Sequence, residues 1–368
     1  RMTALSTGGG MIEVVEIDGV AVSMAGDYHE TLIYVDSGAR ELREFLAGQV
    51  EADEIHSFSG SGLQLVEVKG QRSLEHGIVA ELRTAFDVAQ IKTLSPVLPV
   101  LSRKAIRVPF ITCEEMLQTN EELGLDLWEL AVRYECARGN LSPEQVTQRM
   151  GEIVRIMQRS ILEGVAGTEY ADRILGHQSG LYQSRMEEQR LLDAGILNTM
   201  ILYVTAMMEV KSAMGLIVAA PTAGACGGLP GACIGAASAM GLSRDEMTRA
   251  MLAAGMIGVF IAAHATFAAE LGGCQAECGA GSGMAAAALV TLAGGTIKQA
   301  VAAASMALQN ILGMVCDPVA NRVEVPCLGK NVMAASNALS CANMALAGYD
   351  PVIPLDEVIA AMNIVGGS

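Results

Sequence analysis

Short runs with a two-residue hydrophobic period alternate with helical runs over the first hundred residues of the chain. The segments MIEVVEI and VAVSM flank Asp18-Gly19, a dipeptide typical of a type I′ hairpin turn. The next six runs predict strand, helix, strand, strand, helix and strand: TLIYVD, ARELREFLAG, EIHSFSG, LQLVEVKG, LEHGIVAELRTAF and VAQIKTL. This is the element order of ferredoxin-like domains. We therefore expect an α+β domain over residues 1–100, with a regulatory or assembly role rather than a catalytic one.

A linker and a second, helical domain are predicted next. The segment SPVLPVLSRKAIRVPF (residues 95–110) carries three prolines and predicts the linker. Beyond it, four helix starts carry a capping box, in which Ser or Thr and a Glu or Gln three residues later satisfy free backbone donors. These pairs are Thr112 and Glu115, Ser142 and Gln145, Ser243 and Glu246, and Thr296 and Gln299. Pro143 suits a first helical position, and the helix opened by Thr296 is expected to end at Gly313. We expect an all-α domain with Gly-rich loops over residues 108–368.

Two long uncharged stretches, residues 250–269 and 278–297, are long enough to cross a membrane. They are rich in Ala and Gly and poor in Leu and Phe, so their transfer into lipid is only weakly favourable. Charged residues follow closely at both ends. We therefore expect helices buried in a protein core rather than a membrane role.

The charge balance argues against a nucleic-acid partner. The 368 residues carry 24 Lys and Arg against 40 Asp and Glu, a net charge of −16, whereas phosphate binding needs a basic surface. The nine cysteines are an odd number without an apolar leader, so we expect a cytoplasmic protein whose thiols are ligands or core residues. The chain begins with Arg1 rather than Met, which suggests a fragment or a trimmed chain.

A Gly- and Pro-rich loop, PTAGACGGLPG (residues 221–231), precedes an Ala-rich helix. Its backbone N–H groups and the following helix N-terminus could hold an anion such as a carboxylate. A tight connection between packed helices is the alternative. The loop is not a P-loop, because no Gly-Lys-Ser/Thr follows.

Four cysteines lie in two further motifs. LGGCQAECG contains Cys274 and Cys278, whose side chains would share one face of a continuous helix, and GMVCDPVANRVEVPC contains Cys316 and Cys327. Packing, a disulfide and a metal are all possible roles for such thiols. The five remaining cysteines lie in apolar or Gly-rich text and are expected to be packing residues: Cys113, Cys136, Cys226, Cys233 and Cys341.

The three motifs, in this order, resemble the α chain of the iron–sulfur-dependent L-serine dehydratases (L-serine ammonia-lyases). The resemblance covers about residues 112–365 and includes the cysteine spacings, 42 residues from Cys274 to Cys316 and 11 more to Cys327. The text from STGGGMIEVVEIDG onward resembles the end of that family's β region running into an ACT-like domain.

The resemblance implies a [4Fe–4S] cluster held by Cys274, Cys316 and Cys327. Three thiolates leave one iron open as a Lewis acid, which would help the β-hydroxyl of L-serine to leave. A base then removes the α-proton, and the products are pyruvate and ammonia. A homo-oligomer or a separate β region is the expected partner. Threonine or cysteine as substrate, or a non-catalytic regulatory or assembly module, are the alternatives; no lysine has a convincing setting for pyridoxal phosphate.

His264, the one histidine near the cysteine motifs, is either the general base or a core histidine. The family more often has Asn there, in an N-A-S-I-x-G-A-E setting, where this chain has HATFAAEL. Lys211 also stands where Asn is expected, and its role is open. The remaining residues that match family motif positions are candidates for substrate or cluster contacts: Thr222, Gly224, Gln275, Glu277 and Asn331.

Overall fold

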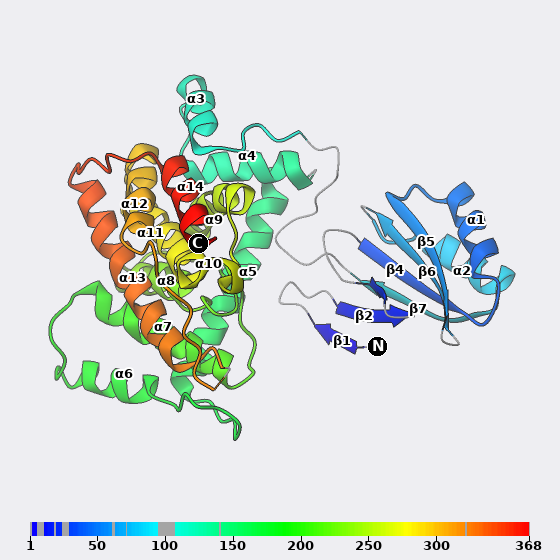
Figure 1. The fold of residues 1–368 in the computed structure, drawn as a ribbon, viewed down its shortest axis with the longest axis horizontal. Coiled ribbons are helices and arrows are strands. Elements are labelled where there is room, and N and C mark those ends of the chain that lie inside the picture. The colour runs from blue at the N-terminus through cyan, green and yellow to red at the C-terminus, as the bar shows by residue number, and fades with distance from the viewer. Residues whose placement is uncertain are drawn as a thin grey trace. The chain divides into compact units, whose positions relative to one another are not determined.

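The chain folds into two compact units, Arg1–Arg107 and Val108–Ser368 (Figure 1). The structure is a computed structural model, and it describes residues 2–5, 11–17, 20–23, 29–60, 63–70, 72–94, 107–139, 141–320 and 322–367. The predicted linker lies mostly at residues 95–106, outside the described residues.

The first unit contains a four-stranded antiparallel sheet with two helices. Its elements are β4 (His29–Val35), α1 (Ala39–Gln49), β5 (Glu54–Gly60), β6 (Leu63–Gly70), α2 (His76–Ala85) and β7 (Val88–Leu94). The strands lie in the order β5-β6-β4-β7. Leu42 and Leu46, one turn apart on α1, pack with Leu82 of α2 against Ile33 and Val66 of the sheet. The predicted order of strands and helices is confirmed, and the ACT-like assignment stays a prediction.

A second, three-stranded antiparallel sheet precedes these elements. It contains β1 (Met2–Leu5), β2 (Met11–Ile17) and β3 (Val20–Ser23), in that order. Ile17 pairs with Val20, which confirms the predicted hairpin. Its two turn residues, Asp18 and Gly19, lie outside the described residues, so the turn type stays a prediction.

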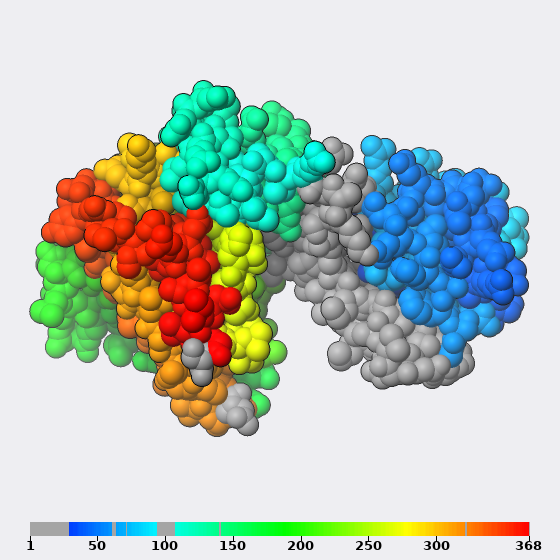
Figure 2. Space-filling model, turned by 45° about the horizontal axis from the view of Figure 1, so that its top comes forward, coloured from blue at the N-terminus to red at the C-terminus, as the bar shows by residue number. Residues whose placement is uncertain are grey.

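The second unit is helical, as predicted. Its elements are α3 (Cys113–Leu123), α4 (Leu127–Gly139), α5 (Pro143–Ala166), α6 (Ser179–Glu187), α7 (Ile196–Ser212), α8 (Gly228–Ala239), α9 (Arg244–His264), α10 (Ala269–Gly272), the π-helix η1 (Gln275–Gly279), α11 (Ala280–Leu292), α12 (Ile297–Gln309), α13 (Val325–Leu346) and α14 (Leu355–Gly366). All four predicted capping boxes are present, at the starts of α3, α5, α9 and α12. Figure 2 shows α14 beside α3, and Asp356 of α14 accepts from the backbone N–H of Cys113 at 2.9 Å.

The helix opened by Thr296 ends at Gln309, and the prediction that it reaches Gly313 is wrong. The Asn310 side chain donates to Asn337 at 2.8 Å, and the N–H of Ile311 bonds to a carbonyl only three residues back. These bonds replace the next α-helical turn. Gly313, with φ +83°, then redirects the chain.

The centre of the helical unit is α11, which packs against α8, α9, α12 and α13. Small residues allow this close packing: a Cβ on Gly283 would lie 2.9 Å from Leu308 Cγ. Among the described helices, only α9 is long and apolar enough to cross a membrane, and 67% of its apolar window is buried inside the unit. The expectation of core helices in these uncharged stretches is therefore confirmed.

Candidate functional site

Three segments that are distant in the sequence bring the predicted ligand cysteines together. Cys274 lies between α10 and η1, Cys316 lies in the loop after α12, and Cys327 lies in the first turn of α13. The Cys274 and Cys316 thiols are within hydrogen-bonding reach, and Cys327 is close enough to both for the charges to interact. Cys274 and Cys327 are buried, whereas Cys316 is exposed. The three sulfurs therefore converge at one edge of the helical unit.

Cys274 and Cys278 do not lie on a continuous α-helix, so the condition under which their side chains would share one helical face is not met. The chain leaves α10 at Gly273, which has φ +71° and ψ −176°. It then forms a π-helical turn before α11 begins. Gly273 packs so closely on the loop after α12 that a Cβ there would lie 2.7 Å from the Met314 carbonyl oxygen. The Gln275 N–H also donates to this oxygen at 3.0 Å, so contact with a distant segment produces the turn.

The π-helical turn brings a fourth cysteine to the site. Cys278 is buried, and its charge would interact with those of Cys274 and Cys327. The Asn331 Nδ2 donates to its sulfur at 3.6 Å. Insertions of this kind in α-helices are frequent at functional sites. The sequence motif had marked Cys278 only as a weak local pair with Cys274.

The buried thiols hold their protons tightly. Burial raises the pKa of Cys274 to about 12, and the Lys330 ammonium opposes this effect. Burial also raises the pKa of Cys327, opposed by the Lys211 ammonium. Metals bind the thiolate, so a metal at this site would displace these protons, and the neighbouring lysines would favour the anionic sulfurs.

Three converging thiols are the kind of donor set that an iron–sulfur cluster uses. In the part of the chain that the structure describes, no group of three His, Cys, Asp or Glu side chains is arranged to hold one metal ion. In an iron–sulfur cluster each thiolate binds a different iron, so the sulfurs stand further apart than around one ion. Thiolates are also the ligands that such clusters prefer.

Lys330 fixes the loop that carries Cys316. Its Nζ donates to the Val315 carbonyl at 2.6 Å and to the Asp317 carboxylate, the residues on either side of Cys316. It also bonds to the Cys274 sulfur. The sequence reading missed Lys330 and Asp317, although Lys330 follows Cys327 by three residues, the spacing of one helical face.

The Gly-rich loop packs on the π-helical turn through Glu277. The Thr222 hydroxyl donates to the Glu277 carboxylate. A Cβ on Gly224 would lie 2.6 Å from Glu277 Oε2, so a larger residue there would displace this carboxylate. Burial raises the pKa of Glu277, and the Thr222 hydrogen bond opposes the rise. Three of the predicted contact residues therefore meet beside the cysteines.

The other two predicted contact residues have their polar atoms engaged by protein groups. Asn331 is fully buried; its Nδ2 donates to the Gly224 and Cys327 carbonyls at 2.9 and 2.8 Å, and its Oδ1 accepts from the Gly228 N–H at 2.7 Å. Gln275 is buried and bonds to the backbone of Met362 and Gly313. Both side chains therefore hold the site's segments together.

His264 lies at the C-terminal end of α9, and its side chain is exposed, so the alternative of a core histidine is wrong. Its Nε2 lies 3.1 Å from the Ile111 carbonyl oxygen. A carbonyl only accepts, so Nε2 is the donor in this contact. The His264 charge also acts on Glu115 at the start of α3. Among the described residues, His264 makes no hydrogen bond to a cysteine.

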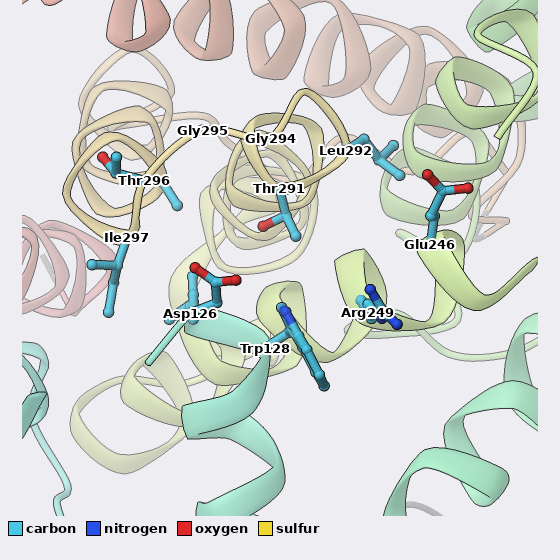
Figure 3. A pocket seen from close by; sticks show the side chains of 12 residues that line it. Asp126, Trp128, Glu246, Arg249, Thr291, Leu292, Gly294, Gly295, Thr296 and Ile297 are labelled. Carbon is cyan, nitrogen blue, oxygen red and sulfur yellow. The ribbon is translucent and has the colours of Figure 1, made fainter. Parts of the chain in front are cut away.

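The described residues of the helical unit line several cavities, and no cysteine lines either of two that stand out. The smaller, of about 220 Å³, is lined by His264 together with Gly272 and Ala276 of the π-turn region. The larger, of about 250 Å³, lies between α4, α9 and the α11–α12 turn (Figure 3). There the Arg249 guanidinium stacks 5.0 Å from the ring centre of Trp128. The larger cavity is thus separate from the sulfur site.

Lys211, in the last turn of α7, lies near the sulfur site. Its charge acts on Cys327, Glu277 and Cys226. Its Nζ is buried and has no hydrogen-bond partner among the described residues. The sequence had marked Lys211 only as a departure from the family's usual Asn. Its placement by the sulfurs comes from the packing of α7 against α8 and α13.

Comparison with known proteins gives a consistent match. The family model described as "Serine dehydratase alpha chain" matches residues 122–368. A "Probable L-serine dehydratase, alpha chain" of Bacillus subtilis is 36% identical over 257 residues, which cover 70% of this chain and 86% of the relative. An "L-serine dehydratase, alpha chain" of Peptoniphilus asaccharolyticus is 34% identical over 259 residues, 70% of this chain and 88% of the relative.

A further match extends into the first unit. The "L-serine dehydratase 1" of Escherichia coli is 29% identical over 351 residues, which cover 93% of this chain and 74% of the relative. The similarity therefore spans the α+β unit as well as the helical unit that contains the cysteines.

Proposed function

The chain belongs to the serine dehydratase alpha-chain family and is an enzyme, a lyase, and from that premise we propose that it converts L-serine to pyruvate and ammonia. The α-proton and the β-hydroxyl leave as water. The aminoacrylate that remains becomes an imine, which water hydrolyses. The relatives, which are named L-serine dehydratases, support this choice of substrate.

The convergence of Cys274, Cys316 and Cys327 is the observation that carries this proposal. We propose that these three residues hold a [4Fe–4S] cluster. When bound, such a cluster supplies an open iron that acts as a Lewis acid toward the β-hydroxyl. The donor chemistry and the neighbouring lysines support this assignment.

The protein residues around the sulfurs would order the site. Lys330 holds the Cys316 loop against α13, and Asn331 ties the Gly-rich loop to the turn that carries Cys327. Glu277 and Thr222 are the polar side chains beside the sulfurs that we propose face the substrate. Gln275 and Asn331 are proposed as positioning residues, since their polar atoms already bind protein groups.

We propose that His264 is the base that removes the α-proton. Its Nε2–H is engaged by Ile111, which leaves Nδ1 able to accept a proton. It lines a cavity together with Gly272 and Ala276, which stand two residues before and after Cys274 in the chain. An H264N variant separates this role from a structural one, because the Asn amide can still donate to Ile111 but cannot take up a proton. Loss of turnover with unchanged iron content and unchanged L-serine affinity is expected.

The proposal is tested by measuring iron and sulfide content after anaerobic reconstitution, together with pyruvate release from L-serine. L-Threonine and L-cysteine are assayed in parallel. We expect about four irons per chain and turnover of L-serine in preference to the other two. Iron without turnover would direct attention to another substrate or to a partner β region, and absence of iron would overturn the cluster assignment.

A matched pair of variants locates the cluster. Cys274→Ser removes a ligand and should lower both iron content and turnover at least about 100-fold, since the cluster is expected to be lost with any one of its ligands. Cys136→Ser changes a half-buried thiol outside the site and should leave both near wild type. Equal iron content in the two variants would contradict the proposed ligand set.

A further inference from the structure

Lys211 brings a buried amino group to the region of the sulfurs. Its Nζ is buried without a hydrogen-bond partner among the described residues. A buried ammonium group is costly to desolvate unless an acceptor or an anion balances it. Lys330, the other lysine by the sulfurs, donates instead to Val315 and Asp317. Lys211 is therefore the lysine that is ready to bind an anionic ligand.

The position of Lys211 on α7 is well anchored. Two residues earlier, Glu209 is fully buried and accepts hydrogen bonds from the Ser179 hydroxyl at 2.6 Å, from the Gln178 N–H at 2.6 Å and from His177 Nδ1 at 2.9 Å. These bonds fix the end of α7 against the segment before α6. The ammonium of Lys211 is thus presented from a rigid helix end.

The groups around Lys211 suggest which anion it binds. Its charge acts on the Glu277 carboxyl and on the Cys327 and Cys226 thiols. Lys211 and Glu277 make no ion pair in the described part of the chain, although each lies within the other's electrostatic reach. A cation and an anion that are held apart match the two charges of an amino acid, an α-carboxylate and an α-ammonium group.

We propose that Lys211 binds the α-carboxylate of the amino-acid substrate while Glu277 accepts from its α-ammonium group. This inference rests on the proposed function and assigns the substrate contacts within it. The zwitterion would then span from α7 to the π-helical turn, next to Cys327. An anionic sulfur cluster is the other partner that an ammonium could serve here, and the test separates the two.

The assignment has a consequence for the reaction. Removal of the α-proton places negative charge on the α-carbon, and that charge spreads into the adjacent carboxylate. A fixed ammonium at the carboxylate stabilises this charge as it develops. Lys211 should therefore influence kcat as well as the affinity for the substrate.

The test compares two ligands that differ only in the carboxylate. L-Alanine lacks the β-hydroxyl and is not turned over, and L-alaninamide also lacks the negative charge. Their inhibition constants against L-serine are measured for reconstituted wild type, Lys211→Met, Lys211→Arg and Lys298→Met, a control on the exposed face of α12. Lys211→Met should weaken the binding of L-alanine about 10- to 100-fold, the range of a charge-assisted hydrogen bond. It should weaken the binding of L-alaninamide less than about threefold. Lys211→Arg should keep part of the preference for L-alanine, and Lys298→Met should keep all of it.

Iron content is measured for every variant, so that the outcomes stay distinct. If Lys211→Met weakens the binding of both ligands equally, or of neither, the ratio of their inhibition constants is unchanged and the proposal is overturned. Lower iron content with an unchanged ratio also overturns it and assigns the lysine to the cysteines. If wild type turns over L-serine but binds neither ligand, this inference alone fails; if it neither turns over L-serine nor binds either ligand, the proposed function fails as well.

Discussion

The π-helical turn and the loop after α12 both bring a cysteine to the site, but different forces hold them. In the turn, Cys274 is buried, Gly273 touches the Met314 carbonyl, and Gln275 bonds to two backbone segments. In the loop, Cys316 is exposed, as are its neighbours Val315 and Asp317. Ion pairs hold this loop: Lys330 of α13 pairs with Asp317 beside Cys316, and Arg322 within the loop pairs with Asp172.

The comparison shows that one site can combine two kinds of placement. Close packing and backbone hydrogen bonds determine where the Cys274 sulfur lies, to within the tolerance of a protein core. Exposed ion pairs contribute little to stability and respond to salt. We therefore expect the turn to be the rigid half of the site and the loop to be the half that opens first.

The largest expected difference is in the free energy of unfolding, between alanine substitutions at two glycines with positive φ. Gly273→Ala should lower the free energy of unfolding by about 2–4 kcal/mol, because its backbone region is nearly restricted to glycine and its Cβ would meet Met314. Gly313→Ala should cost only about 1 kcal/mol, because φ is +83° but a Cβ there meets nothing within 4 Å. Urea unfolding of the iron-free variants measures both. Equal costs would remove the distinction between turn and loop.

High pH should lower the free energy of unfolding through the buried thiols of the helical unit. Burial raises the pKa of Cys233, in α8 behind the Gly-rich loop, to about 12 from its ordinary 9.0. Above pH 9 the unfolded chain releases this proton while the folded chain keeps it, so stability falls as pH rises toward 12. The slope is about 1.4 kcal/mol per pH unit for this thiol. Urea unfolding between pH 8.5 and 10.5 should give a shallower decline for Cys233→Ala than for wild type. Parallel declines would contradict the buried, protonated thiol.

Removal of Lys330 should act mainly on the loop. Lys330→Met loses its bonds to Val315 and Asp317, whose groups can still reach water, so we expect a loss of about 1 kcal/mol. Limited proteolysis should then cut the loop several-fold faster. The Lys298→Met variant, on the exposed face of α12, serves as the control. Unchanged cleavage of the loop would show that Lys330 does not hold it.

Salt should give the smallest effect and should be confined to the loop. The Debye length falls from about 10 Å at 0.1 M salt to about 3 Å at 1 M, which screens exposed ion pairs such as Arg322–Asp172. Proteolysis at the loop should accelerate modestly in wild type between these two conditions. In Arg322→Gln the rate should already be raised at low salt and should respond less to added salt. A salt response equal to that of wild type would exclude this ion pair as its source.

Local interactions explain why so much of the helical unit could be predicted from the sequence. Each capping box joins residues three apart, such as Thr112 and Glu115, so no knowledge of distant segments is needed. The strands and helices between residues 29 and 94 likewise follow from their own hydrophobic period. The end of α12 was misplaced because Asn310 bonds to Asn337 on another helix.

The site was less predictable, because its geometry depends on contacts across the chain. The three cysteines were identified by resemblance to a family, since their spacing alone left packing, a disulfide or a metal open. The π-helical turn depends on Met314, which lies 41 residues beyond Gly273. The roles of Lys211 and Lys330 could not be predicted from the sequence. They depend on the packing, which gives the Lys330 ammonium hydrogen-bond partners and leaves Lys211 without one among the described residues.

The start of α13 also constrains how the length of the chain can vary between relatives. Cys327, Lys330 and Asn331 stand at positions i, i+3 and i+4 of one helix, and their contacts involve the sulfur site, the Cys316 loop and the Gly-rich loop. One inserted residue between Cys327 and Lys330 would rotate the later side chains by about 100° and separate them from the sulfur. An insertion at the exposed residues 317–320 would leave that face intact. Natural length differences should therefore accumulate before α13 and be excluded from its first two turns.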